Sequence, residues 1–165
     1  RPILPLAATI AFAGSGAAPA AELFGGLHAH GVKTPLSLNS DREGGADLSL
    51  GLRGGRIAGT PLQPHAYASV NLEGGTNFLS AGLSARFGGR VYVRPGVGLA
   101  IHDGSASKVE QPDRLALGSR ILFAPELAIG AQVSDRVGVE ASWVHFSHGQ
   151  LFGRQNPGID NIGLG

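Results

Sequence analysis

Residues 78–87, FLSAGLSARF, carry the pattern that decides the fold. Successive side chains of an extended chain point to opposite faces, so this stretch would have one apolar face and one small or polar face. The apolar face comprises Leu79, Ala81, Leu83, Ala85 and Phe87. The opposite face comprises Ser80, Gly82, Ser84 and Arg86. An apolar outside and a polar or small inside are what a narrow membrane barrel requires.

Short stretches of this kind recur along the chain, separated by turn residues, and we expect eight strands. They are residues 22–30, 46–55, 65–73, 78–87, 91–102, 120–133, 137–147 and 160–165. Most approach the roughly 9–11 residues that a tilted strand needs to cross a bilayer. The links 88–89 and 134–136 are tight, whereas 31–45, 103–119 and 148–159 are long and polar. The pattern predicts an all-β fold, an eight-stranded antiparallel up-and-down transmembrane β-barrel of the outer-membrane type.

The composition agrees with a membrane barrel and excludes several other classes. Only 15% of the 165 residues are charged and 27 are glycine, whereas about 25% charged residues is usual in soluble domains. The chain has no cysteine, which excludes disulfides, thiolate metal sites and a cysteine nucleophile. A net charge of +1 without a basic stripe gives no case for nucleic acid. The alternative is a soluble lipocalin-like barrel with its apolar face inward, but Arg53, Arg86 and Glu126 fall on the expected inner faces.

The first 20 residues read as a secretory signal peptide. Arg1 precedes the apolar run ILPLAATIAFAG, and the tract ends at Ala18-Pro19-Ala20, which resembles a cleavage site. The run is too short for a spanning helix, which needs about 20 apolar residues. We therefore expect residues 1–20 to be a signal peptide and 21–165 to be the outer-membrane barrel. Residues 160–165 make only half a strand, so we expect the last strand to be truncated.

Polar side chains stand on an apolar face at the end of the stretch 137–147. This strand follows a tight turn and would run outward, with His145 and Ser147 near its outer end on the same face as Trp143. The returning strand begins at Asp160, which falls on the same face as Ile162 and Leu164, two apolar residues that we expect to face lipid. Facing residues of antiparallel strands lie within side-chain contact. The hairpin would therefore bring His145, Ser147 and Asp160 together at the lipid–water boundary.

A hydroxyl, an imidazole and a carboxylate in mutual reach can catalyse acyl transfer. Ser147 would attack an ester carbonyl, His145 would accept and return its proton, and Asp160 would orient the imidazole. The backbone N–H groups of His148 and Gly149 are our candidates for stabilising the oxyanion and positioning the substrate. The alternative is an ordinary His and Ser at the membrane interface, beside the aromatic side chains of Trp143 and Phe146.

Other histidines and arginines suggest weaker hypotheses. His28 and His30 share an inward-pointing face and could begin a metal site, but no third ligand is evident. We therefore expect packed or water-bound histidines and no metal. Arg42, Arg114 and Arg154 fall in the expected outer loops, where they could meet the phosphates of an anionic glycolipid. The alternative for these three is solvated loop charge.

The C-terminal segment 145–165, HFSHGQLFGRQNPGIDNIGLG, resembles the PagL-type lipid A 3-O-deacylases, also grouped as acyloxyacyl-hydrolase-like outer-membrane proteins. The resemblance is carried by His145-Phe146-Ser147 and Asn156-Pro157-Gly158-Ile159. It implies a barrel in the outer membrane of a Gram-negative bacterium, with a lipid-facing His/Ser/acid triad that needs no cofactor. The implied reaction removes the ester-linked 3-hydroxyacyl chain at position 3 of lipid A, and the implied partners are lipopolysaccharide and outer-membrane lipids.

The chain departs from that family at two positions. The residue after the nucleophile is usually Asn in the family and is His148 here, and the acid is usually Glu and is Asp160 here. Our prediction is an outer-membrane serine esterase. The alternatives are a catalytically inactive structural or adhesion barrel and a secreted soluble lipid-binding barrel. A homodimer is compatible with this prediction.

Overall fold

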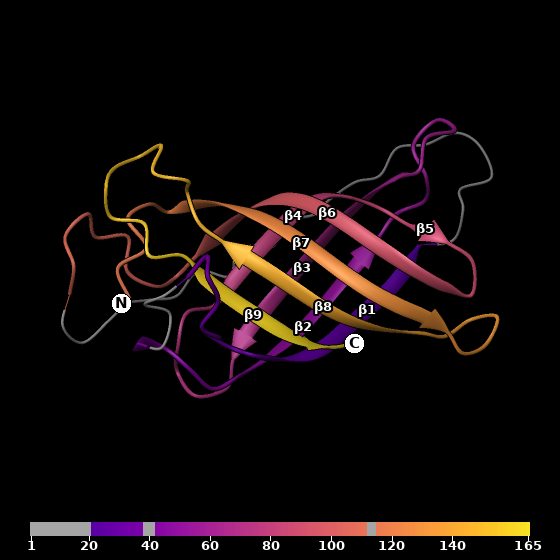
Figure 1. The fold of residues 1–165 in the computed structure, drawn as a ribbon, viewed down its shortest axis with the longest axis horizontal. Helices are drawn as coiled ribbons and strands as arrows, with labels where there is room; N and C mark the ends of the chain where they lie inside the picture. Colours follow the sequence, from indigo (N-terminus) through magenta and orange to yellow (C-terminus); the bar gives the residue numbers. More distant parts are fainter. Residues whose placement is uncertain (1–20, 38–41, 112–114) are drawn as a thin grey trace, which may run out of the picture.

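The computed structural model describes residues 21–37, 42–111 and 115–165, and these form a closed β-barrel (Figure 1). The expected signal peptide, residues 1–20, lies outside the described residues. The strands are β1 Glu22–Ala29, β2 Ala46–Arg53, β3 Leu62–Asn71, β4 Phe78–Ala85, β5 Phe87–Gly88, β6 Val91–His102, β7 Ile121–Gln132, β8 Gly138–Phe146 and β9 Ile159–Leu164. No helix in the described ranges is long and apolar enough to cross a membrane.

Eight strands of the described chain, all except the two-residue β5, form the barrel wall, which confirms the predicted antiparallel up-and-down fold. Each pairs with its neighbours in sequence, and β5 is a two-residue continuation of β4 that also pairs with β6. The short β9 pairs along β8 on one edge and with Leu27–Ala29 of β1 on the other. The barrel therefore closes where its first and last strands meet.

Side chains alternate between the two faces of the wall as the sequence predicts. In β2, Leu48, Leu50 and Leu52 are more than half exposed, whereas Ser49 and Arg53 are buried inside. A face of exposed leucines is stable in hydrocarbon and costly in water. The apolar face therefore points outward, opposite to a soluble lipid-binding barrel.

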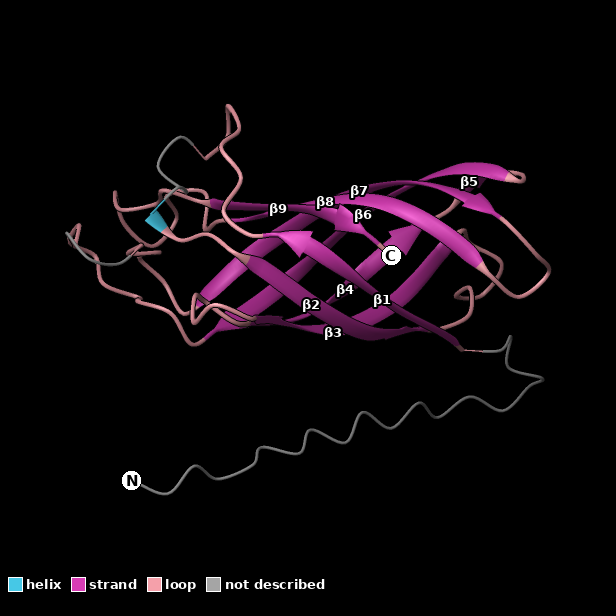
Figure 2. Ribbon diagram, turned by 90° about the horizontal axis from the view of Figure 1, so that it is seen from below, coloured by secondary structure: helices cyan, strands magenta, loops and turns pink. Residues whose placement is uncertain are grey.

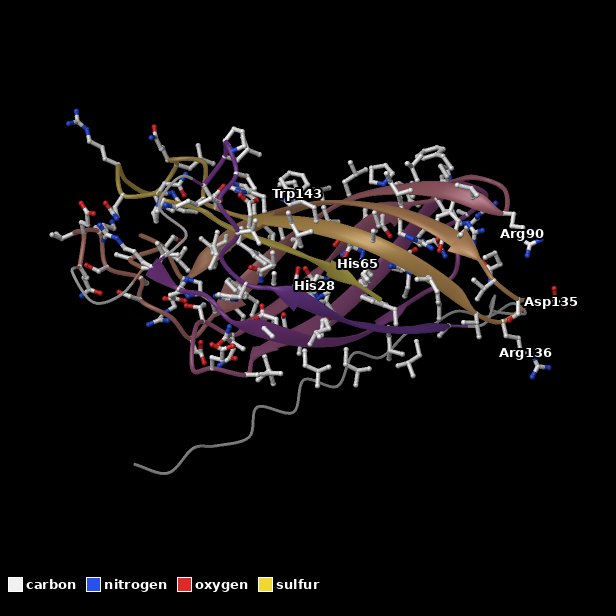
Figure 3. The ribbon with its side chains drawn as sticks, turned by 60° about the horizontal axis from the view of Figure 1, so that its bottom comes forward. His28, His65, Arg90, Asp135, Arg136 and Trp143 are labelled. Carbon is white, nitrogen blue, oxygen red and sulfur yellow. The ribbon has the colours of Figure 1, made fainter. Side chains whose placement is uncertain are left out.

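The two ends of the barrel differ, and we call them the loop end and the turn end (Figure 2). The loop end carries the connections 30–45, 72–77, 103–120 and 147–158, and the turn end carries 54–61, 89–90 and 133–137. Arg90, Asp135 and Arg136 are labelled at the turn end in Figure 3. The alternation of lengths is imperfect, because 72–77 is shorter than 54–61.

The interior holds an apolar cluster toward the loop end and ion pairs toward the turn end. Phe78 and Phe146 stack with ring centroids 4.1 Å apart, and Leu115 and Leu117 from the loop 103–120 pack into the same cluster. A cavity of about 780 Å³ extends from this cluster toward the turn end and is lined by ion pairs such as Arg94–Glu140. Phe146 is fully buried inside, so the interpretation that placed it at the membrane interface is wrong, because its parity on β8 is opposite to that of Trp143.

Candidate active site

His145 and Asp160 face each other across β8 and β9, near the loop end of the wall. The strand register pairs their Cα atoms directly, and His145 Nδ1 lies 3.0 Å from Asp160 Oδ1. A carboxylate can only accept hydrogen bonds, so Nδ1 carries a hydrogen, and in the neutral form of the ring the lone pair is on Nε2. The imidazole therefore has the tautomer that a general base requires.

The Asp160 carboxylate is fully buried and accepts four hydrogen bonds. Oδ1 accepts from Trp143 Nε1 at 2.8 Å as well as from His145. Oδ2 accepts from Thr34 Oγ1 at 2.5 Å and from Ser37 Oγ. Hydrogen bonds to a charged acceptor are strong and directional, so these donors fix the carboxylate opposite His145.

Thr34 and Ser37 reach Asp160 because the loop after β1 folds back over β9. Val32 N donates to the Asp160 main-chain oxygen at 2.8 Å, which extends the β1–β9 pairing beyond the end of β1. The turn that follows brings both hydroxyls over the carboxylate. This loop therefore covers the acid on the outside of the barrel, a feature that the sequence analysis missed.

Ser147 lies two residues beyond His145 on the same face, at the point where β8 ends. Its backbone exchanges two hydrogen bonds with Phe123 of β7, with N···O distances of 3.1 and 2.7 Å. Gly158 packs against the imidazole, because a Cβ at this position would lie 2.7 Å from His145 Cε1. Ser147 is thus anchored by β7, while His145 is held between Asp160 and Gly158.

The loop after Ser147 is organised by His148, which is fully buried. Its Nε2 donates to Gln155 O at 2.6 Å, and its Nδ1 accepts from Phe152 N at 3.4 Å. The His148 backbone N–H donates to Asn156 Oδ1 at 2.9 Å. Of the two backbone groups predicted to stabilise an oxyanion, the His148 N–H is therefore engaged, whereas Gly149 is exposed with a φ of 58°. The structural role of the His148 ring was not predicted.

A polar network inside the barrel lies behind the site. Asn161 follows Asp160 on β9 and points inward, where its Nδ2 donates to Asp47 Oδ2 at 2.7 Å. His30 Nδ1 also contacts the Asp47 carboxylate at 2.9 Å, and Glu43 Oε2 lies 3.5 Å from His30 Nε2. Among the described residues, no group of three or more His, Asp or Glu could hold a metal ion. The network joins β9 to β2 and to the loop after β1.

The charge on His30 should make barrel stability depend on pH. Burial lowers the pKa of His30, but hydrogen bonds with Asp47 and Glu43 and the charges of these carboxylates outweigh burial and raise the pKa to about 9. The folded pKa exceeds the unfolded value, so this contribution is complete below about pH 6.5 and is lost as pH rises through about 9. We expect the free energy of unfolding to fall between pH 7 and 10.

Urea unfolding in lipid vesicles at several pH values measures this effect. In His30→Gln, the free energy of unfolding should decline less between pH 7 and 10 than in the parent protein. The other titrating groups contribute equally to the parent and the variant. Parallel curves for the parent and the variant would show that His30 does not supply the pH dependence.

Comparisons with known proteins agree with this geometry. A family model described as lipid A 3-O-deacylase (PagL) matches residues 59–165. A solved structure, described as the crystal structure of the outer membrane enzyme PagL, superposes with a TM-score of 0.60 at 19% identity. The similarity covers 86% of this chain and 95% of that chain, and it shows a shared fold. A comparison with curated protein sequences gives no match.

Proposed function

We propose that this chain, which belongs to the PagL family of lipid A 3-O-deacylases, removes the ester-linked 3-hydroxyacyl chain at position 3 of lipid A. Family membership makes the protein an ester hydrolase of the outer membrane. The proposal adds the bond that is cut and the residues that cut it, a triad of Ser147, His145 and Asp160. The observation that carries the triad is the 3.0 Å contact between His145 Nδ1 and a fully buried carboxylate on the outside of the wall.

In the proposed reaction, Ser147 Oγ attacks the ester carbonyl while His145 Nε2 accepts the hydroxyl proton. The resulting tetrahedral oxyanion needs a donor, and we assign this role to the Gly149 N–H, since the His148 N–H donates to Asn156. Collapse breaks the ester bond and His145 protonates the leaving sugar hydroxyl. Water then hydrolyses the acyl-enzyme by the same proton transfers, releasing a 3-hydroxy fatty acid. Asp160 stabilises the imidazolium that forms in each step.

The position of the triad suits a substrate that is part of the bilayer. Trp143 on β8 donates to Asp160, and Phe123 on β7, which is partly exposed on the outer face, pairs with Ser147. A glycolipid can therefore reach Ser147 by moving laterally in its leaflet, without entering the barrel. Polar groups on a lipid-facing surface are costly, which favours a functional role for them.

Mass spectrometry of lipid A from cells with and without the protein tests the proposed reaction. We expect the protein to cause the loss of one 3-hydroxyacyl chain, and fragmentation should assign that loss to position 3. Loss of a chain from another position would contradict the proposed bond, and unchanged lipid A would contradict the proposed substrate.

Gly158 gives a test of the proposed position of His145. In Gly158→Ala the new Cβ would lie 2.7 Å from His145 Cε1, so the imidazole must move. A misplacement of about 1 Å can reduce a rate by about 100-fold, and we expect a loss of 10- to 100-fold, roughly, in kcat. Ester hydrolysis in detergent micelles measures it.

The matched control is Gly74→Ala, because Gly74 also has a positive φ of 86° but has nothing within 4 Å of the added Cβ. It should have nearly the parent activity. Equal losses in the two variants would indicate backbone strain, and would rule out displacement of His145 as the cause.

A further inference from the structure

Three loops at the loop end enclose a small polar pocket of about 180 Å³. Arg42 comes from the loop after β1, Glu110 from the loop after β6, and Arg154 and Asn156 from the loop after β8. We propose that this pocket binds a phosphate group on the sugar headgroup of the glycolipid substrate. The inference rests on the proposed function, because it names how that substrate is held.

Positive charge dominates the pocket and its surroundings. Arg42 is paired with the Glu110 carboxylate and donates from Nη1 to Gln111 O at 2.9 Å, so its guanidinium is held in place. Arg154 also lines the pocket, and its side chain is exposed. Two guanidinium groups thus accompany one carboxylate in the lining of the pocket. Guanidinium groups match phosphate oxygens in geometry and are weakly hydrated, so an anionic phosphate is the ligand that this pocket suits.

The wall of the pocket is fixed by buried contacts. His148 is fully buried, and it holds the main chain of Gln155 with Nε2 and the side chain of Asn156 with its backbone N–H. Gln155 Nε2 in turn donates to Ala116 O at 3.3 Å, which ties this wall to the neighbouring loop. These hydrogen bonds therefore hold the polar groups of Gln155 and Asn156 in the wall of the pocket that Arg42 also lines.

The pocket is connected directly to the triad through the chain. Pro157 lines the pocket, and the next residue, Gly158, packs against His145. A sugar whose phosphate occupies the pocket would therefore present its acyl ester beside the imidazole. Its acyl chain would extend along the apolar outer wall. This arrangement gives the enzyme a means of selecting a phosphorylated headgroup.

The test compares two 3-O-acylated glucosamine lipids that differ only in a phosphate on the sugar. In Arg154→Gln we expect KM for the phosphorylated lipid to rise about tenfold, the value of one charge-assisted hydrogen bond. A double variant with Arg42→Gln should show a larger rise. Hydrolysis of the dephosphorylated lipid should change by less than about twofold. Arg136→Gln, at the turn end, removes the same charge far from the site and should affect neither lipid.

Binding to the Ser147→Ala variant separates this inference from the proposed function. If the parent hydrolyses neither lipid but Ser147→Ala retains the phosphorylated lipid and loses it when Arg154→Gln is added, the pocket is supported and the proposed deacylation is refuted. Hydrolysis by the parent with equal losses on both lipids in Arg154→Gln would overturn the pocket and leave the esterase standing. Inorganic phosphate and phosphatidylglycerol vesicles are tested as competitors for binding of the phosphorylated lipid. If either competes as well as the unlabelled phosphorylated lipid does, the proposal that the pocket binds the phosphate of a sugar headgroup is overturned.

Discussion

Ser147→Ala is expected to reduce ester hydrolysis by at least about 10³-fold, because removal of the nucleophile from a triad leaves only binding and oxyanion stabilisation. The mutated side chain is small and half-buried, and its backbone bonds to Phe123 do not involve the hydroxyl. The barrel should therefore fold normally. Turnover of a 3-O-acylated glycolipid in micelles measures activity, and heat-dependent gel migration reports the folded barrel.

Ser142→Ala is the matched control for this prediction. Ser142 lies on the same strand but points inward, where its Oγ lies 2.9 Å from His28 Nε2. Ser142 therefore contacts a histidine on the inner face of the wall, whereas Ser147 lies on the outer face, and only the outward serine should matter for hydrolysis. Full activity in Ser147→Ala, or an equal loss in Ser142→Ala, would contradict the proposed nucleophile.

Asp160→Asn should reduce kcat by about 10³- to 10⁴-fold with little change in KM. The amide keeps the size of the side chain, and its NH₂ can face the hydroxyls of Thr34 and Ser37, which are able to accept. Its oxygen would then still accept from Trp143 and His145. What the variant loses is the negative charge that stabilises the imidazolium in each proton transfer.

Two further variants separate this electrostatic effect from a loss of folding. Asp103→Asn changes an exposed carboxylate that accepts from Asn77 at the same end of the barrel, and it should keep the parent kcat. A double variant with Ser147→Ala should be no slower than Ser147→Ala alone, since triad residues act as a unit. An Asp160→Asn protein with the parent kcat would remove Asp160 from the proposed mechanism.

Much of the fold could be predicted from the sequence because a barrel wall obeys a period of two. The alternation of outward-facing apolar residues such as Leu79 with inward-facing small residues predicts strand ranges that agree with the observed strands to within a few residues. The same parity placed His145 and Asp160 on the outer face of adjacent strands, where the register pairs them. Only β3 begins clearly earlier than expected, at Leu62, because Pro64 is tolerated within that strand.

The surroundings of the acid could not be predicted because loops have no such period. Thr34 and Ser37 are more than 120 residues from Asp160 in sequence. A partial signal existed, since closing a barrel places the loop after the first strand beside the last strand. The burial of His148 could not be predicted from the sequence either. It depends on the path of the chain from Gly149 to Asn156 and on the loop that packs against this segment.

The meeting of β1 and β9 has a consequence for when the enzyme becomes active. Ser147 and His145 belong to β8, but the donors that fix the Asp160 carboxylate include two hydroxyls that follow β1. A chain whose strands had all formed but whose two ends had not yet joined would lack the anchored acid. Hydrolysis is therefore a reporter of completed insertion: in a refolding experiment, turnover should appear with the last step of assembly, after the strand signal is complete.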